Sequence, residues 1–244
     1  MRRALVSVAT EPYHILQDRQ IQWFGEVDPG CLTRLWREIP KSWPSHEQRP
    51  YAFKSRALVA AAETIDLLLW CDAAVVPIRS MAPLWKRIEQ DGYWVMNNGW
   101  KNDAWTATEA YEILFPGMPL AKARQANKEI PHVCAAAFGV NVKHPIGQML
   151  LSDYFRLCDT EAIRGPWKNT PDTRCGPPGV LGHRHDQTIL SIVAHDLGCK
   201  LTSCPDVFAY APHETEASII VSDGAMTLKR PFTIANQVTL ARSS

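Results

Sequence analysis

Apolar runs alternate along the chain with segments whose apolar residues recur at helical spacing. The short runs predict strands and the longer periodic segments predict helices. The predicted strands cover residues 4–9, 32–39, 67–71, 93–96, 133–142, 199–203 and 207–210. The predicted helices cover residues 13–24, 51–65, 81–90, 105–114, 120–127, 145–158 and 185–197. This alternation predicts a single α/β domain.

The segment 67–71, Leu-Leu-Leu-Trp-Cys, is apolar at every position. A strand without polar alternation is buried on both faces, as in the middle of a sheet that helices cover on both sides. We therefore expect a mixed, mostly parallel central sheet flanked by helices. Residues 40–50 contain three prolines, and residues 159–182 are rich in Gly, Pro and Thr, so both segments are predicted loops. The second loop is long enough to close over a ligand as a lid.

Composition narrows the class of protein. The 244 residues include 26 Lys and Arg against 25 Asp and Glu, a net charge of +1, which argues against a non-specific nucleic-acid coat protein and a disordered regulator. The seven cysteines are scattered without a CxxC pair, as in proteins of a reducing compartment. The longest apolar segment, residues 65–78, contains Asp66 and Asp72 and cannot span a membrane. We expect a cytoplasmic protein with no membrane span.

Three polar clusters follow predicted strands or begin helices, where ligands bind in open α/β sheets. They are Thr10-Glu11 after the first strand, Asp72 after the 67–71 strand, and Gly-His-Arg-His-Asp-Gln at 182–187, which opens the last long helix. Asp72 is either a turn or cap residue or a carboxylate aimed at a divalent metal or a sugar hydroxyl. We expect Asp72 and residues 183–186 to share one pocket.

The 182–187 segment allows three interpretations. It is an ordinary helix start with Asp186 near the positive end of the dipole, or an anion site in which Arg184, His183 and His185 act together. A zinc site of His183, His185 and His195 is disfavoured, because side chains two residues apart diverge on a helix.

The order of these segments resembles glycosyltransferases of the GT-A fold, including small phage and bacterial ones. The resemblance is carried by a first strand ending at Thr10, Tyr-Ala-Phe-Lys at 51–54, Leu-Trp-Cys-Asp-Ala-Ala at 69–74, Asp-Gly-Tyr at 91–93 and His-Arg-His-Asp-Gln-Thr at 183–188. The last motif is similar to the Asp-Gln pair of retaining enzymes of the glycogenin and lipopolysaccharide galactosyltransferase type. The likeness implies a GT-A (Rossmann-like) domain over residues 1–213, with residues 214–244 as a C-terminal strand or tail packed on it.

The resemblance implies a hexosyl transfer from a nucleotide-diphosphate sugar, with a UDP-sugar favoured and retention of configuration. Its predicted donor-binding residues are Thr10, Lys54, Asp72, His183, Arg184 and His185. Asp186, with Gln187, lies near the sugar as nucleophile, as stabiliser of the cationic carbon, or as hydrogen-bond acceptor.

Enzymes of this fold usually hold Mn²⁺ or Mg²⁺ with an Asp-x-Asp motif. Here Asp72 keeps the first position and Ala74 occupies the second. His213 stands roughly where the galactosyltransferase-like enzymes supply a late metal-binding histidine. If no metal binds, Lys54 and Arg184 are left to neutralise the diphosphate.

The acceptor side is predicted from a cluster of indoles. Trp100 and Trp105 offer faces that stack on sugars or bases, unless they are core residues, and Asp103 is a candidate general base. The expected acceptor is a glycan, a protein or a modified phage DNA base. Competing hypotheses are a catalytically weak nucleotide-sugar-binding homologue and a metal-dependent hydrolase or nucleotidyltransferase. A Rossmann dehydrogenase is set aside, because no GxGxxG follows the first strand.

Overall fold

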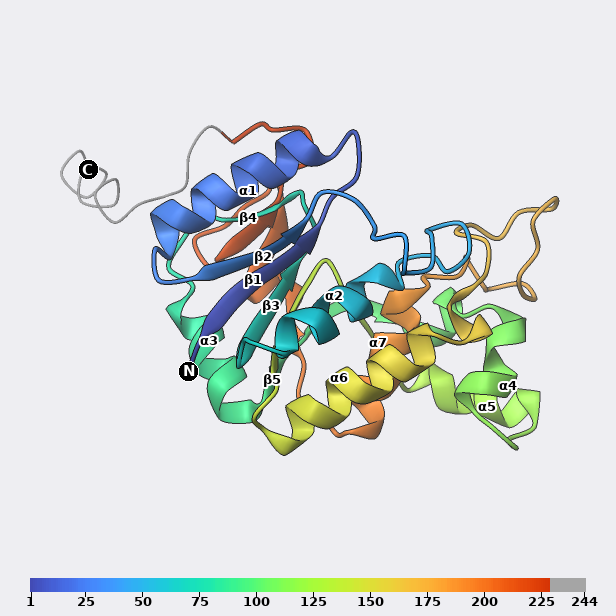
Figure 1. The fold of residues 1–244 in the computed structure, drawn as a ribbon. Coiled ribbons are helices and arrows are strands. Elements are labelled where there is room, and N and C mark those ends of the chain that lie inside the picture. Colours follow the sequence, from blue (N-terminus) through green and yellow to red (C-terminus); the bar gives the residue numbers. More distant parts are fainter. Residues whose placement is uncertain (229–244) are drawn as a thin grey trace.

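The computed structural model describes residues 1–228. A five-stranded sheet in the order β2-β1-β3-β8-β5 lies at the centre (Figure 1). Its strands are β1 (Arg3–Val8), β2 (Leu32–Trp36), β3 (Leu67–Cys71), β5 (Tyr93–Trp94) and β8 (Ala137–Asn141). β1 pairs in parallel with β2 and β3, whereas β8 is antiparallel to both β3 and β5, so four of the five strands share one direction. The predicted mixed, mostly parallel α/β sheet is confirmed.

The central strand β3 is buried on both faces, as its unbroken apolar sequence predicts. Leu68 and Trp70 pack into one core, and Leu67, Leu69 and Cys71 into the other. Side chains alternate between the faces of a strand, so each core receives every second residue.

Helices cover both faces of the sheet (Figure 1). Phe24 of α1 (His14–Val27) and Ile88 of α3 (Ala82–Asp91) pack in the core that contains Leu69. The opposite core contains side chains of three further helices, with α6 beside α7 and α2. These are α2 (Phe53–Ala62), α6 (Pro145–Cys158) and α7 (Asp186–Asp196). The shorter α4 (Tyr111–Leu114) and α5 (Leu120–Lys128) lie together at the side of the molecule.

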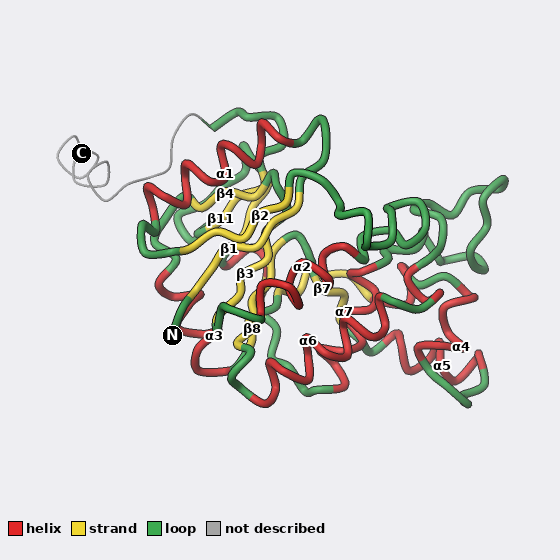
Figure 2. The backbone as a smooth tube through the Cα atoms, viewed as in Figure 1, coloured by secondary structure: helices red, strands yellow, loops and turns green. Residues whose placement is uncertain are grey.

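Two small sheets complete the fold (Figure 2). One has the order β10-β11-β4 and the other the order β7-β6-β9. Their strands are β4 (Val75–Pro77), β6 (Met96–Lys101), β7 (Pro131–Val133), β9 (Thr202–Ser203), β10 (Phe208–Tyr210) and β11 (Ile220–Ser222). β11 lies between β10 and β4, so this part of the predicted C-terminal segment is hydrogen-bonded into a sheet; residues 229–244 of that segment lie outside the described residues.

Several predicted boundaries are wrong. The single strand expected over residues 133–142 is two strands, β7 and β8, separated by a turn, and the strand over 93–96 is β5 followed by β6. Instead of one helix over residues 105–114, short 3₁₀ turns at Asn102–Trp105 and Thr108–Ala110 precede α4. The Ala107 N–H donates to the ring of His183, far along the chain, so a tertiary contact replaces a helical hydrogen bond there.

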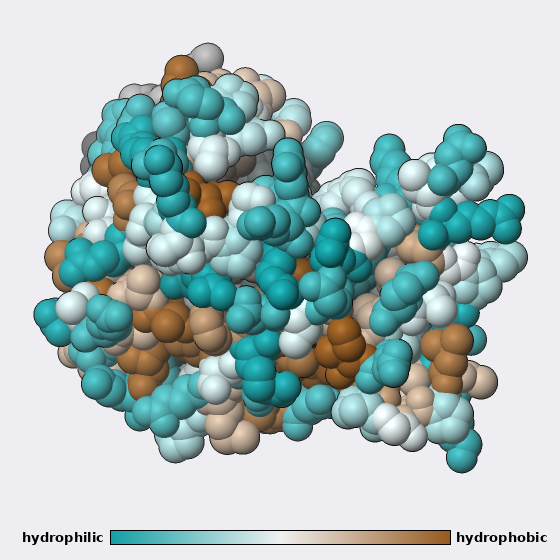
Figure 3. Space-filling view, turned by 45° about the vertical axis from the view of Figure 1, so that its right-hand side comes forward, coloured by the Kyte–Doolittle hydropathy of each residue, from teal (hydrophilic) through white to brown (hydrophobic). Residues whose placement is uncertain are grey.

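The surface in Figure 3 is mainly hydrophilic, with hydrophobic side chains in several small separate patches. Within residues 1–228, every helix is too short or too polar to cross a membrane.

Candidate active site

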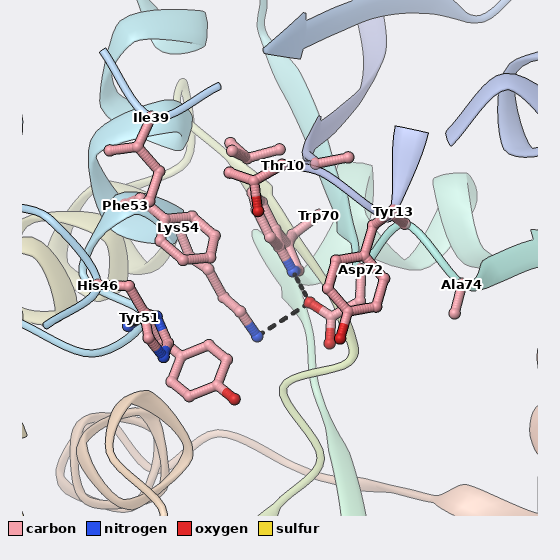
Figure 4. A pocket seen from close by; sticks show the side chains of 13 residues that line it. Thr10, Tyr13, Ile39, His46, Tyr51, Phe53, Lys54, Trp70, Asp72 and Ala74 are labelled. Atoms are coloured by element: carbon pink, nitrogen blue, oxygen red, sulfur yellow. Dashed lines mark hydrogen bonds and ion pairs between the residues drawn. The ribbon is translucent and has the colours of Figure 1, made fainter. Parts of the chain in front are cut away.

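A pocket of about 380 Å³ opens at the carboxyl ends of β1 and β3 (Figure 4). Its walls come from the ends of these two strands, from the residues that follow them and from the start of α2. The loop between β2 and α2 contributes Ile39 and His46. Thr10 and Tyr13 line the side that follows β1. The pocket therefore lies at the edge of the sheet where α/β folds bind ligands.

Lys54 joins three segments at the base of this pocket. Its Nζ lies 3.0 Å from Asp72 Oδ1, 3.1 Å from Asp186 Oδ2 and 3.1 Å from the Ala135 carbonyl oxygen. The lysine side chain is buried, so one ammonium group holds together the end of β3 and the start of α7. Asp72 and Asp186 therefore meet at Lys54, whereas His183, Arg184 and His185 do not line the pocket.

Burial and charge oppose each other in this cluster. Burial on its own would lower the pKa of Lys54, but the two carboxylates outweigh it and raise that pKa above its usual value. Burial raises the pKa of Asp186 to about 6, against the lowering effect of Lys54, and the charge of Asp72 adds to the increase. At pH 7 the site thus contains one ammonium and two carboxylates.

Asp72 keeps one oxygen free for a ligand. Its Oδ1 accepts from the Trp70 indole at 2.9 Å and contacts Lys54, and Figure 4 shows both nitrogens aimed at this oxygen. Within residues 1–228 no hydrogen bond to Oδ2 is formed, and the side chain is 40% exposed. The Gln20 side chain fixes the turn by donating to the Asp72 carbonyl oxygen at 2.8 Å. Ala74 also lines the pocket and offers no second carboxylate.

The start of α7 is an unusual turn. His185, just before the helix, has φ 48° and ψ −114°, a conformation that residues with a Cβ rarely adopt. Its Nδ1 lies 2.9 Å from the Ile163 carbonyl oxygen, which ties the turn to the neighbouring loop. A Cβ at position 182 would lie 2.1 Å from the Trp167 carbonyl oxygen, so only glycine fits there. The Gly182–Asp186 motif is thus a compact turn that directs Asp186 toward Lys54.

The two histidines of this motif differ from their predicted roles. His183 is fully buried; its Nδ1 accepts from the Ala107 N–H and its Nε2 lies 2.9 Å from the Ala162 carbonyl oxygen. Both ring nitrogens of His183 are therefore occupied, and neither is left to bind a nucleotide-sugar donor. Burial lowers the pKa of His183 to about 3 and that of His185 to about 4, so both rings are neutral at pH 7 and add no positive charge for an anion.

Arg184 lies outside the pocket lining and stacks with indoles. Its guanidinium carbon is 3.8 Å from the ring centre of Trp167 and 4.2 Å from that of Trp105. Trp100 stacks on Trp105 with ring centres 4.9 Å apart, so the two predicted acceptor-binding indoles lie together.

The remaining predicted residues lie around this centre. The backbone N–H of Gln187 donates to the Arg184 carbonyl oxygen, and its side chain interacts with His132. Asp103 belongs to the 3₁₀ turn before α4 and interacts electrostatically with Tyr111. His213 is exposed just after β10, and its N–H donates to the Tyr210 carbonyl oxygen.

Metal ligands are sparse in the part of the chain that the structure describes. No group of three or more His, Cys, Asp or Glu side chains there is arranged to hold an ion.

The residues that sequence reasoning missed are Tyr13, Tyr51 and Trp70 in the pocket and Trp167 beside Arg184. The role of Trp70 could not be predicted, because the sequence of an all-apolar strand does not indicate that the Trp70 indole N–H reaches a carboxylate.

No protein-family model matches the chain, and no curated protein matches it in sequence. Among solved structures, apo mouse xyloside xylosyltransferase 1 is similar with a TM-score of 0.50 and 8% identity, over 94% of this chain and 100% of that one. A glycosyltransferase involved in glycosylation of the major capsid of PBCV-1 has a TM-score of 0.49 and 12% identity, over 93% and 95% of the two chains. The WbbM bifunctional glycosyltransferase has a TM-score of 0.49 and 10% identity, over 94% of this chain and 46% of that one. The likeness to the xylosyltransferase shows a shared fold, which confirms the predicted glycosyltransferase-like fold.

Proposed function

We propose that this protein is a glycosyltransferase that moves a sugar from a nucleotide-diphosphate sugar to an acceptor hydroxyl. The observation that carries the proposal is the Lys54 ammonium shared by Asp72 and Asp186 beside a pocket at the ends of β1 and β3. The fold shared with a xylosyltransferase supports the same reaction class.

The donor nucleotide occupies the pocket, with its base or ribose near Thr10 and Tyr13. A volume of about 380 Å³ and a wall rich in aromatic side chains suit a bound nucleotide. The Tyr13 ring is exposed and available for stacking on the base. A UDP-sugar and a hexosyl group are the donor chemistry we favour, with Lys54 and Asp72 facing the diphosphate end.

Charge balance supports a divalent cation in the donor complex. Two carboxylates and one ammonium leave the centre with a charge of −1, which would repel a diphosphate unless another cation enters. The free Oδ2 of Asp72 fits Mg²⁺ or Mn²⁺, which proteins often hold through one carboxylate together with substrate phosphates. Such an ion would neutralise the leaving diphosphate. His213 remains the predicted second protein ligand, whereas Arg184, which the sequence also predicts near the donor, lies outside the pocket lining.

Asp186 acts on the sugar. Breaking the anomeric C–O bond leaves positive charge on the sugar carbon and negative charge on the diphosphate. The Asp186 carboxylate stabilises the carbon, as a nucleophile in a retaining reaction or through space, while Gln187 holds sugar hydroxyls. Lys54 favours the charged form of Asp186 against burial. The acceptor hydroxyl forms the new C–O bond, and Asp103 is the predicted base for its proton.

Calorimetry with UDP-, GDP- and other nucleotide sugars, with and without Mn²⁺, followed by an assay of sugar hydrolysis, tests the proposal. We expect one nucleotide class to bind, its sugar to be hydrolysed slowly, and Asp186→Asn to abolish turnover while retaining the fold and nucleotide affinity. Loss of nucleotide binding with turnover retained would contradict these roles. Binding without turnover in the unaltered protein would favour a nucleotide-sugar-binding protein, and tightly retained zinc would favour a metal-dependent hydrolase.

A further inference from the structure

Three indoles surround the guanidinium of Arg184. Trp105 and Trp167 stack against it at 4.2 Å and 3.8 Å, and Trp100 lies 5.6 Å away. Trp100 is 45% exposed and Trp167 is 41% exposed, which is unusual for such large apolar side chains. We call Arg184, Trp100, Trp105 and Trp167 the indole platform. It combines apolar surface with a single positive charge.

Among residues 1–228, the positive charge of the platform has no anionic partner. Within residues 1–228 no carboxylate forms an ion pair with Arg184, and its Nε is buried without a hydrogen bond. Burial lowers the pKa of Arg184, although the group stays charged at neutral pH. The buried cations Lys54 and Arg19, in contrast, each contact an aspartate. A partly desolvated guanidinium with unused donors is suited to an anion brought by a ligand.

The indole platform adjoins the proposed active site without forming part of the donor pocket. Tyr51 lines the pocket, and its ring centre lies 6.1 Å from that of Trp167. Arg184 is two residues from Asp186, and the Arg184 N–H donates to the Trp105 carbonyl oxygen at 3.2 Å. The loop bearing Trp167 is fixed to the same turn, because the His183 N–H donates to the Pro166 carbonyl oxygen. A ligand on the platform would therefore lie next to the sugar-transfer centre.

We infer that the indole platform binds a carbohydrate acceptor that carries an anionic group, such as a uronate residue. Indole surface packs against the apolar face of a sugar ring, and a planar guanidinium binds a carboxylate through two hydrogen bonds. A nucleic-acid strand fits less well, since it needs several cations along its backbone and the chain has a net charge of only +1. This inference rests on the proposed function, because only a glycosyltransferase has an acceptor. Binding of the anionic sugar can nevertheless be tested without turnover.

The test compares trigalacturonate with the neutral galactose trisaccharide in which CH₂OH replaces each carboxylate. Binding is followed by tryptophan fluorescence, at low and high salt. We expect the unaltered protein to bind trigalacturonate at least about tenfold more tightly than the neutral sugar, as a charge-assisted hydrogen bond gives. Arg184→Gln should remove this preference and leave the neutral affinity within about twofold. Trp167→Ala should weaken the binding of both sugars.

Arg156→Gln, at an exposed arginine on α6, is the matched control and should keep the preference. Circular dichroism and thermal unfolding show whether each variant is folded, and Arg184→Lys, which keeps the charge without the planar group, provides a second variant. Equal affinity of the unaltered protein for the two sugars overturns the inference, as does tighter binding of an oligothymidine. A loss of UDP affinity in Arg184→Gln as large as its loss of trigalacturonate affinity also overturns it, because it assigns Arg184 to the donor.

UDP-sugar binding by the same preparations separates the two proposals. Trigalacturonate binding without any nucleotide binding would reject the proposed function and keep the anionic-sugar site. Nucleotide binding and hydrolysis without a preference for trigalacturonate would reject the inference alone.

Discussion

Asp186 combines a buried position with a proposed role that requires its charge. It is 3% exposed, and burial raises its pKa to about 6 even though Lys54 lies 3.1 Å away. A carboxylate that stabilises a cationic carbon must be ionised, so this pKa falls in the range where activity is measured. The protonation state of one residue should therefore be visible in the rate.

We expect kcat/KM for sugar release to fall at acidic pH. Because the carboxylate is the active form, kcat/KM should be half-maximal near pH 6, level above pH 7, and about tenfold lower at pH 5 than at pH 7. Steady-state kinetics between pH 4.5 and 8.5 measure this profile. Activity that rises as pH falls would show that Asp186 acts as an acid and would contradict the role proposed here.

Residue types and their order along the chain predicted the centre of the site, although not its contacts. Asp72 and Asp186 were identified because each follows a strand or begins a helix, and the sheet brings such positions together. That Lys54 lies between them depends on how α2 packs, which spacing does not reveal. The neutral state of His183 was equally inaccessible, since it depends on a carbonyl and an N–H from distant loops.

Among the elements, those with the clearest apolar pattern were the easiest to predict. β3 and α6 have the predicted bounds, because an unbroken apolar run and a helical repeat each have one simple solution. The segment after β6 was mispredicted, since its backbone groups bond to distant residues such as His183. β4 was missed because a strand of only three residues, Val75–Pro77, is too short to show a pattern.

The described end of the chain is fixed beside the pocket by one buried ion pair. Arg19 on α1 donates to Asp223 Oδ2 at 2.7 Å, and the Asp223 N–H donates to the Ala74 carbonyl oxygen at 2.9 Å. Met226 packs against an apolar cluster that includes Ala9 and Ala73, both of which line the pocket. The segment after β11 therefore supports one wall of the proposed donor site.

Arg19→Met should destabilise the protein by about 3–5 kcal/mol, because it leaves the Asp223 carboxylate buried without its cation. Urea unfolding measures the loss, and we expect nucleotide affinity to fall with it. Arg37→Met is the control: its pair with Asp18 is exposed and screened by water, so stability should change little. Equal effects of the two substitutions would show that Asp223 does not depend on Arg19.

At the scale of the whole molecule, charge is nearly balanced while the proposed centre is not. The chain has a net charge of +1, yet Lys54 meets two carboxylates at the base of a pocket proposed to take a diphosphate. Within residues 1–228 the protein provides no group of three metal ligands, and Asp72 offers one free oxygen. Protein groups alone would therefore hold a divalent ion weakly, whereas a diphosphate would supply the missing oxygens.

From this balance we expect Mn²⁺ and UDP to bind cooperatively. Linkage requires that each ligand raise the affinity of the other by the same factor, which we expect to be at least about tenfold. Calorimetry of UDP with and without Mn²⁺, and electron paramagnetic resonance of Mn²⁺ with and without UDP, measure the two sides of this cycle, after correction for the Mn²⁺–UDP complex that forms in solution. Asp72→Asn should remove most of the cooperativity, because it replaces a charged oxygen with a neutral amide. UDP affinity that is the same in Mn²⁺ and in EDTA would instead leave Lys54 as the cation that faces the diphosphate.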